Sequence, residues 1–215
     1  MPQTRRGGRP SREASEQLGV LILDAATDLF LTHGFGATSI EAVAQRVRIS
    51  KRTFYHRFED KPALFAAVVH RIIERLRPRA DIPLIEGADL QTKLERLAAL
   101  ILRAALSPQA IALHRLIVAE SARFPKLATV VSREGATEEA IKLIAGLLER
   151  EVKAGRLKLD DPVFAAQQFL QMVIGLPQRR AMGLGASMTA RELAAWPRDV
   201  VHLFLNGCRG EQRTR

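Results

Sequence analysis

The chain has 215 residues, of which 47% are hydrophobic and only 5% aromatic, and its formal net charge is +10. That length suffices for one large domain or two small ones with a buried core. Ala, Leu, Arg and Glu dominate while β-branched runs are sparse, which predicts an all-α fold. The strong positive charge favours a nucleic acid or an anionic surface as the partner.

Redox and targeting features are few. The single cysteine, Cys208, excludes an internal disulfide and is typical of a cytoplasmic protein. The basic N-terminus lacks the apolar run of a signal peptide. Apolar stretches such as 97–102 are far shorter than the roughly 20 residues of a membrane span. We therefore expect a soluble cytoplasmic protein without membrane contact.

The N-terminal third is expected to hold a basic arm and four helices. Residues 1–12 carry four arginines and no acid, and form either a solvated tail or an arm that follows DNA. Gly34 is a stop signal for the first helix, and Thr38-Ser-Ile-Glu41 reads as a capping box for the second. The expected helices run from Ser11 or Glu13 to His33, from Thr38 to Val47, from Ser50 to Phe58 and from Asp60 to Arg77.

The rest of the chain predicts a second helical domain. Pro78 and Pro83 mark the expected boundary, and Pro197 should kink or restart the last helix. The third helix of this domain is expected to split near Gly135. Its five helical segments are 89–106, 108–122, 125–154, 161–183 and 189–207. The predicted organisation is an N-terminal domain at 13–77, a C-terminal domain at 84–207 and a tail at 208–215.

The segment 38–61 is the most informative part of the sequence. Five basic residues and no acid lie between Arg46 and Arg57, a pattern suited to a polyanion. Two short helices joined by a tight turn predict a helix-turn-helix at about 39–58, whose second helix enters the major groove of DNA. Lys51 and Arg52 could bond the acceptors of guanine, and the Thr53 methyl could contact thymine.

The other polar residues of this segment fit contacts to phosphate. Helix N-termini attract phosphate through free N–H groups, and three such termini are expected here. Each hydroxyl also has a plain role as a helix cap, Tyr55 could be a half-buried packing residue, and His56 could be a solvated surface residue. Phe54 and Phe58 should fix the helix to the core. The expected phosphate contacts are Thr38, Ser39, Ser50, Tyr55, His56 and Lys61.

These residues resemble the DNA-binding domain of the TetR family of bacterial transcriptional regulators. The likeness covers about a third of the chain. The segment from Leu113 to Pro125 is also similar to a subgroup linked to efflux and stress control. The residues that carry the family pattern are Gly34-Phe35, Thr38-Ser39, Ala44, Ile49-Ser50-Lys51, Thr53-Phe54-Tyr55, Phe58, Lys61 and Leu64.

Two positions depart from that pattern. Arg48 stands where a turn glycine is usual, so the residue must tolerate a strained backbone or shift the turn. It also adds a charge near the phosphates. Arg52 follows Lys51 where glycine is frequent, which adds a long donor at the groove and favours a guanine in the operator.

The resemblance implies a ligand-responsive repressor that binds a palindromic operator as a homodimer and needs no cofactor or metal. The helices at 161–183 and 189–207 would form the dimer, unless their outer residues only complete the monomer core. Those residues are Phe164, Gln168, Gln171, Gly175, Val200, Leu203 and Phe204. A largely apolar effector would bind among the C-terminal helices, lined by His114, Phe169, Met172 and Trp196, each of which could instead be a core residue.

Three other classes of protein fit the sequence less well. Catalytic motifs and metal-ligand spacings are absent from the sequence, and its five histidines are scattered, which argues against an enzyme. A sequence-indifferent architectural DNA-binding protein is the main alternative, since the net charge alone would serve it. A basic membrane-surface protein is disfavoured because the apolar helix faces are needed for a core.

Overall fold

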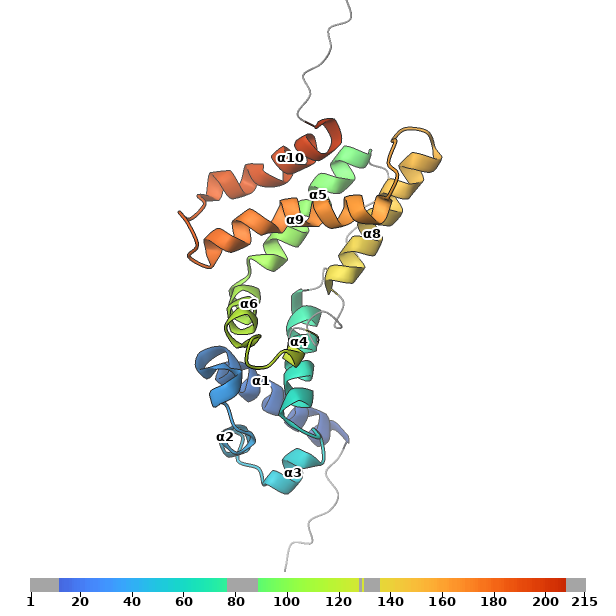
Figure 1. Ribbon diagram of the computed structural model, residues 1–215. Coiled ribbons are helices and arrows are strands. Elements are labelled where there is room, and N and C mark those ends of the chain that lie inside the picture. Colours follow the sequence, from blue (N-terminus) through green and yellow to red (C-terminus); the bar gives the residue numbers. More distant parts are fainter. Residues whose placement is uncertain (1–11, 77–88, 128, 130–135, 208–215) are drawn as a thin grey trace, which may run out of the picture. The chain divides into compact units, whose positions relative to one another are not determined.

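The computed structural model describes residues 12–76, 89–127, 129 and 136–207 (Figure 1). Within these ranges every regular element is an α-helix, which confirms the predicted all-α fold. Residues 1–11 of the basic arm, the tail at 208–215 and the boundary at Pro78 and Pro83 lie outside the described residues, and Arg12 begins α1.

The N-terminal part contains four helices and the C-terminal part five that are described throughout. The first four are α1 (Arg12–Ala37), α2 (Ile40–Arg46), α3 (Lys51–Tyr55) and α4 (Lys61–Leu76). The next five are α5 (Leu90–Ala105), α6 (Pro108–Glu120), α8 (Ala136–Lys153), α9 (Pro162–Ala181) and α10 (Ala190–Asn206).

The chain folds into two compact units. The first comprises Met1–Arg71 together with Leu116–Val131, and the second comprises Ile72–Arg115 together with Ser132–Arg215. The helices α4 and α6 therefore each begin in one unit and end in the other. A stretch that the sequence assigned to the C-terminal domain is thus part of the N-terminal unit.

Aromatic side chains form the centre of the first unit. Phe30, Phe35 and Phe65 are buried, with ring centroids 5.4 to 5.6 Å apart. Ile22 and Ala26 of α1 are fully buried as well. By length and composition α1 could span a membrane, and so could α5 and α6 together if their 65° bend is disregarded. Of the apolar stretch of α1, 28% is buried within the structure.

In the second unit α9 packs against α5, α8 and α10 (Figure 1). Phe169 of α9 is fully buried and meets the Phe204 ring at 4.9 Å. Local sequence fixes the helix starts. Asp161 caps α9, and Thr189 with Glu192 forms a complete capping box at the start of α10.

Several expected boundaries need correction. Ser39 rather than Thr38 caps α2, accepting a bond from the Ala42 N–H, so the capping box expected from Thr38 does not form. Helix α3 ends at Tyr55, although the Phe58 N–H still bonds the Phe54 carbonyl.

Two helix interruptions also differ from expectation, and a third agrees with it. Gly34 has the expected positive φ of 87°, but helical structure resumes after it to Ala37. Helix α10 continues through Pro197, which is buried, instead of restarting there. Helix α8 starts at Ala136, one residue after the break expected near Gly135.

Candidate nucleic-acid interface and ligand cavity

Two short capped helices form a helix-turn-helix. The Ser39 hydroxyl caps α2, and the Ser50 hydroxyl caps α3 by accepting from the Thr53 N–H at 3.1 Å. The turn closes through backbone bonds from Arg48 to Gln45 and from Ile49 to Ala44. Arg48 has a φ of 56°, the single positive value among described residues other than glycine. The arginine therefore adopts the left-handed conformation that glycine would adopt at lower cost.

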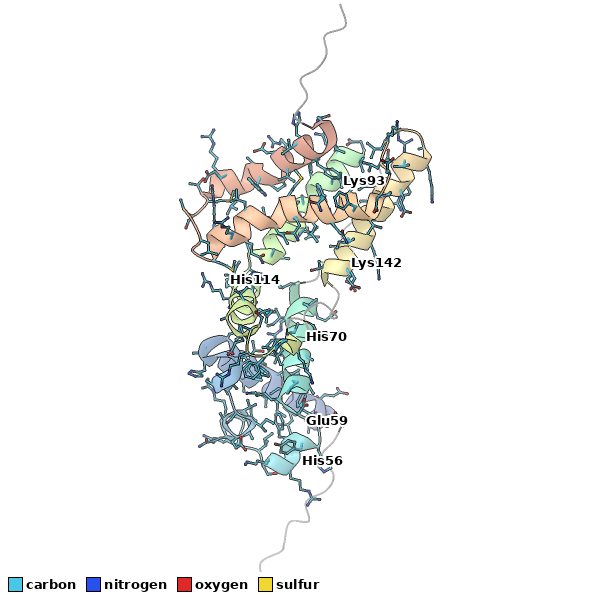
Figure 2. All side chains as sticks on the ribbon, in the orientation of Figure 1. His56, Glu59, His70, Lys93, His114 and Lys142 are labelled. Atoms are coloured by element: carbon cyan, nitrogen blue, oxygen red, sulfur yellow. The ribbon has the colours of Figure 1, made fainter. Side chains whose placement is uncertain are left out.

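Most of the predicted DNA-binding side chains are accessible to solvent. Tyr55 is 51% exposed, and Thr53 is half-buried with its hydroxyl 2.9 Å from that of Ser50. Phe54 beneath them is fully buried, and its ring meets that of Phe58 at 5.6 Å. The exposed members are Ser39, Arg48, Ser50, Lys51, Arg52, Tyr55 and His56, the last of which is labelled in Figure 2.

Thr38 and Lys61 differ from the others because their polar groups bond inside the protein. Thr38 is 3% exposed, and its hydroxyl lies 2.8 Å from the Gly34 carbonyl oxygen. The Lys61 ammonium donates to the carbonyls of Phe35 and Thr38 at 2.8 and 2.9 Å and lies 4.4 Å from the centre of the Phe35 ring. Partial burial lowers the pKa of Lys61. The Thr38 hydroxyl thus bonds to α1, and Lys61 ties the start of α4 to the connection between α1 and α2, so neither belongs to the proposed interface.

Three of the five basic side chains in 46–57 form ion pairs or hydrogen bonds within the protein. Lys51 Nζ lies 2.6 Å from a carboxylate oxygen of Glu41, and Arg46 lies 3.8 Å from Asp28. Arg57 donates to the backbone carbonyl and the hydroxyl of Ser15. No local signal indicates these pairings, because each partner lies several helical turns or more away along the chain.

The end of α6 completes the N-terminal unit. A carboxylate oxygen of Glu120 accepts from the Gly36 N–H at 2.9 Å. The Phe124 ring packs edge-on against Phe35 at 5.0 Å. Both contacts lie at the connection between α1 and α2, which leads directly into the helix-turn-helix. Sequence reasoning missed them because the bonded partners Gly36 and Glu120 are 84 residues apart.

A cavity of about 350 Å³ lies within the second unit. Twelve of its 15 lining residues are aliphatic, so its walls suit an apolar ligand. The walls come from α4, α5, α6, α8 and α9, and include Ile73, Ala104, Ala110 and Leu170. Thr137, Glu139 and Gln178 supply the polar part of the lining.

None of the four residues predicted to contact a ligand lines this cavity. Phe169 is fully buried in the core, and Met172 packs against the same core. The Trp196 indole N–H donates to the Val173 carbonyl at 2.9 Å, which fixes its ring. His114 is half-buried on α6 (Figure 2). The spacing of single large residues does not show which side of a buried helix faces an internal space.

The predicted dimer surface is exposed only in part. Phe164 and Leu203 are 58% and 43% exposed, and Gln168 and Gln171 are also exposed. Gly175 is half-buried. Val200 is 5% exposed, and Phe204 packs on Phe169, so these two belong to the monomer core, as the alternative interpretation predicts.

A short capped helix pair with a basic exposed second helix, built on an all-α scaffold, defines a helix-turn-helix DNA-binding regulator. Residues 22–68 match the model of bacterial regulatory proteins of the tetR family, and residues 92–207 match that of the C-terminal domain of AefR-like transcriptional repressors. The chain belongs to the TetR family of transcriptional regulators. It is therefore a DNA-binding regulator and not an enzyme.

Individual relatives agree with this placement. The flavonoid-responsive regulator FrrA is 33% identical and has a TM-score of 0.75, with 91% of this chain and 99% of that one covered. A TetR family transcriptional regulator from Pseudomonas syringae is 26% identical, with a TM-score of 0.69 over 89% and 96% of the two chains. The HTH-type transcriptional regulator YhgD of Bacillus subtilis is 26% identical over 73% of this chain and 80% of its own length.

Proposed function

We propose that the protein is a cytoplasmic repressor that binds a near-palindromic operator as a homodimer and is released by a small, largely apolar effector. The exposed basic surface of α3 carries this proposal. Lys51 and Arg52 lie at the start of α3, where a helix-turn-helix meets base edges. Ser39, Ser50, Tyr55 and His56 would contact the phosphates, and Arg48 adds a charge beside them.

The dimer part of the proposal rests on apolar exposure along α9 and α10. Val163, Phe164, Leu176 and Leu203 are between 40% and 58% exposed, and a monomer gains nothing by leaving such side chains in water. A dimer would place two copies of α3 about one turn of B-DNA apart, roughly 34–36 Å, and so select a two-fold operator.

The effector part rests on the aliphatic cavity. Helix α4 starts in the first unit with Lys61 and ends in the second, where Ile73 and Leu76 line the cavity. A ligand that binds two arrangements of α4 with different affinities would shift the population that binds DNA. Because FrrA is named as flavonoid-responsive, flavonoids are the first compounds to test as effectors.

Competition binding tests this function against the architectural alternative. Wild-type protein is titrated onto a palindrome selected from random DNA, with bulk DNA as competitor. We expect preference for the palindrome by at least about 10³-fold, as for specific regulators. Equal affinity for both would overturn the proposal.

A further inference from the structure

A carboxylate lies beside Lys51, one of the residues proposed to contact bases. Glu41 lies in the first turn of α2, and Lys51 is the first residue of α3. Lys51 Nζ and Glu41 Oε1 are 2.6 Å apart, and the two side chains are 60% and 54% exposed. The hydrogen bond from Lys51 lowers the pKa of Glu41, and the same bond raises the pKa of Lys51. Both groups are therefore charged at neutral pH.

An ion pair this exposed contributes little to folding, since water competes with both partners. Helices α2 and α3 are already joined by their turn and by the burial of Val43 and Phe54. The physical effect of the pair is on where Lys51 points. Its ammonium is held above the N-terminal turn of α2 rather than free to follow the nearest phosphate.

The carboxylate also acts on the DNA directly. If Lys51 reaches a base edge, Glu41 lies within a few ångströms of the duplex. A negative charge there repels every phosphate, whatever the sequence. A guanine that offers two acceptors to Lys51 can compensate for that repulsion, whereas an unspecific backbone contact cannot.

We propose that Glu41 is a specificity-determining residue, which restrains Lys51 through their 2.6 Å ion pair and weakens binding to DNA that lacks the operator. This inference rests on the proposed role of Lys51 in base reading. In restraining Lys51, Glu41 is a positioning residue for that contact, and its own negative charge adds a direct repulsion of phosphate.

The chain supplies a matched control. Asp28 pairs with Arg46 on the same unit at 3.8 Å, and both of those side chains are more than half exposed. Asp28→Asn and Glu41→Gln each remove one negative charge, but only the second releases Lys51. A general effect of net charge would appear equally in both variants.

The test measures affinity for the operator and for random-sequence DNA over a range of salt concentrations. We expect Glu41→Gln to raise affinity for random DNA about fivefold, the effect of removing one unit charge about 4 Å from another in water. The released lysine should also steepen the dependence of log affinity on log salt by about 0.9 for each Lys51 that turns to phosphate. The ratio of operator to random affinity should fall, and Asp28→Asn should leave it unchanged.

The variants Lys51→Ala and Glu41→Gln/Lys51→Ala form a double-mutant cycle together with Glu41→Gln and the wild type. Without Lys51, the Glu41 substitution should no longer change base preference at the position that Lys51 reads. A change that persists would mean that Glu41 itself contacts a base, such as the amino group of cytosine, and would overturn the proposal. An equal fall of the affinity ratio in Asp28→Asn and Glu41→Gln would also overturn it.

The same variants distinguish an error in the role of Glu41 from an error in base reading by Lys51. If Lys51→Ala relaxes one base position while Glu41→Gln leaves the affinity ratio unchanged, only the role of Glu41 is wrong. If Lys51→Ala leaves base preference intact, the base-reading role of Lys51 is wrong and the inference on Glu41 fails with it. Unchanged thermal unfolding of Glu41→Gln would show that the altered ratio does not come from a loss of fold.

Discussion

The carboxylate of Glu120 accepts a hydrogen bond from the backbone N–H of Gly36, 84 residues earlier in the chain, at 2.9 Å. Glu120 is the last residue of α6, and Gly36 lies in the last turn of α1. The bond therefore ties the end of α6 to the segment that sets the start of the helix-turn-helix. Phe124 reinforces the same junction through its contact with Phe35.

Replacing Glu120 should loosen this junction. We expect Glu120→Ala to lower the free energy of unfolding by about 1–3 kcal/mol, because a partly buried N–H loses a charged acceptor. The Gly36 amide should exchange its hydrogen faster. Glu120→Gln keeps an acceptor and should lose less. If Gly36 exchange is the same in wild type and Glu120→Ala, the bond does not hold the junction in solution.

Two substitutions of Arg48 distinguish the effect of backbone strain on stability from the effect of charge on DNA affinity. The φ of 56° at Arg48 is costly for a side chain with a β-carbon, so Arg48→Gly should raise the free energy of unfolding by about 0.5–1 kcal/mol. Arg48→Ala keeps the strain and should bring no such gain. Both variants remove the same charge, so both should weaken DNA binding equally. Chemical denaturation and DNA titration measure the two effects, and equal stability of the Arg48→Gly and Arg48→Ala variants would refute the strain.

The capping box of α10 should make stability depend on acid pH. A carboxylate oxygen of Glu192 accepts from the Thr189 N–H at 2.6 Å, and this bond lowers the pKa of Glu192 below its ordinary 4.5. The folded state thus binds the proton less tightly than the unfolded state. The resulting stabilisation is present above pH 4.5 and is lost as the pH falls through the folded pKa.

Thermal unfolding between about pH 7 and about pH 3 measures this effect. The melting temperature of Glu192→Gln should fall less steeply toward the acid end than that of the wild type. Asp199→Asn, which removes an exposed acid of the same helix, serves as the control and should follow the wild-type curve. Parallel curves for wild type and Glu192→Gln would contradict the role of the box.

Filling the cavity should abolish the response to an effector without abolishing DNA binding. Ala110 lines the cavity, whereas its neighbour Gln109 is exposed and does not. We expect Ala110→Trp to occupy the space, so that an effector no longer raises the melting temperature or releases DNA. Gln109→Trp adds a side chain of the same size outside and should respond as the wild type. A full response in a folded Ala110→Trp protein would place the effector site elsewhere.

Ala104→Phe provides a second test of the same cavity from α5. Phenylalanine is smaller than tryptophan, so this variant should fold even if the Ala110→Trp variant does not. Its expected effect is weaker effector binding with DNA affinity retained. Full effector affinity in a folded Ala104→Phe protein would count against this cavity.

Local signals explain what the sequence could predict. The bounds of α5, α6, α9 and α10 lie within two residues of expectation, because caps such as Asp89 and Thr189 act on their own helix. At Arg48 the sequence pattern leaves a strained backbone or a shifted turn open, and the φ of 56° corresponds to the strained backbone.

Long-range pairings explain what the sequence could not predict. The side chain of Lys61 resembles a phosphate ligand in the linear pattern, yet its bonds go to carbonyls 23 to 26 residues away. The cavity lining depends on how five helices turn about their axes, which is why leucines, isoleucines and alanines such as Ala104 and Ala110 form it rather than the residues expected.

Selection of bound sequences from a random DNA pool tests the central claim most directly. Wild-type protein should enrich a two-fold pair of half-sites with centres about one helical turn apart. Lys51→Ala and Arg52→Ala should each relax one position of the half-site, at about 1–3 kcal/mol for a bidentate contact. Enrichment of no motif by the wild type, or an unchanged motif in both variants, would contradict base reading by α3.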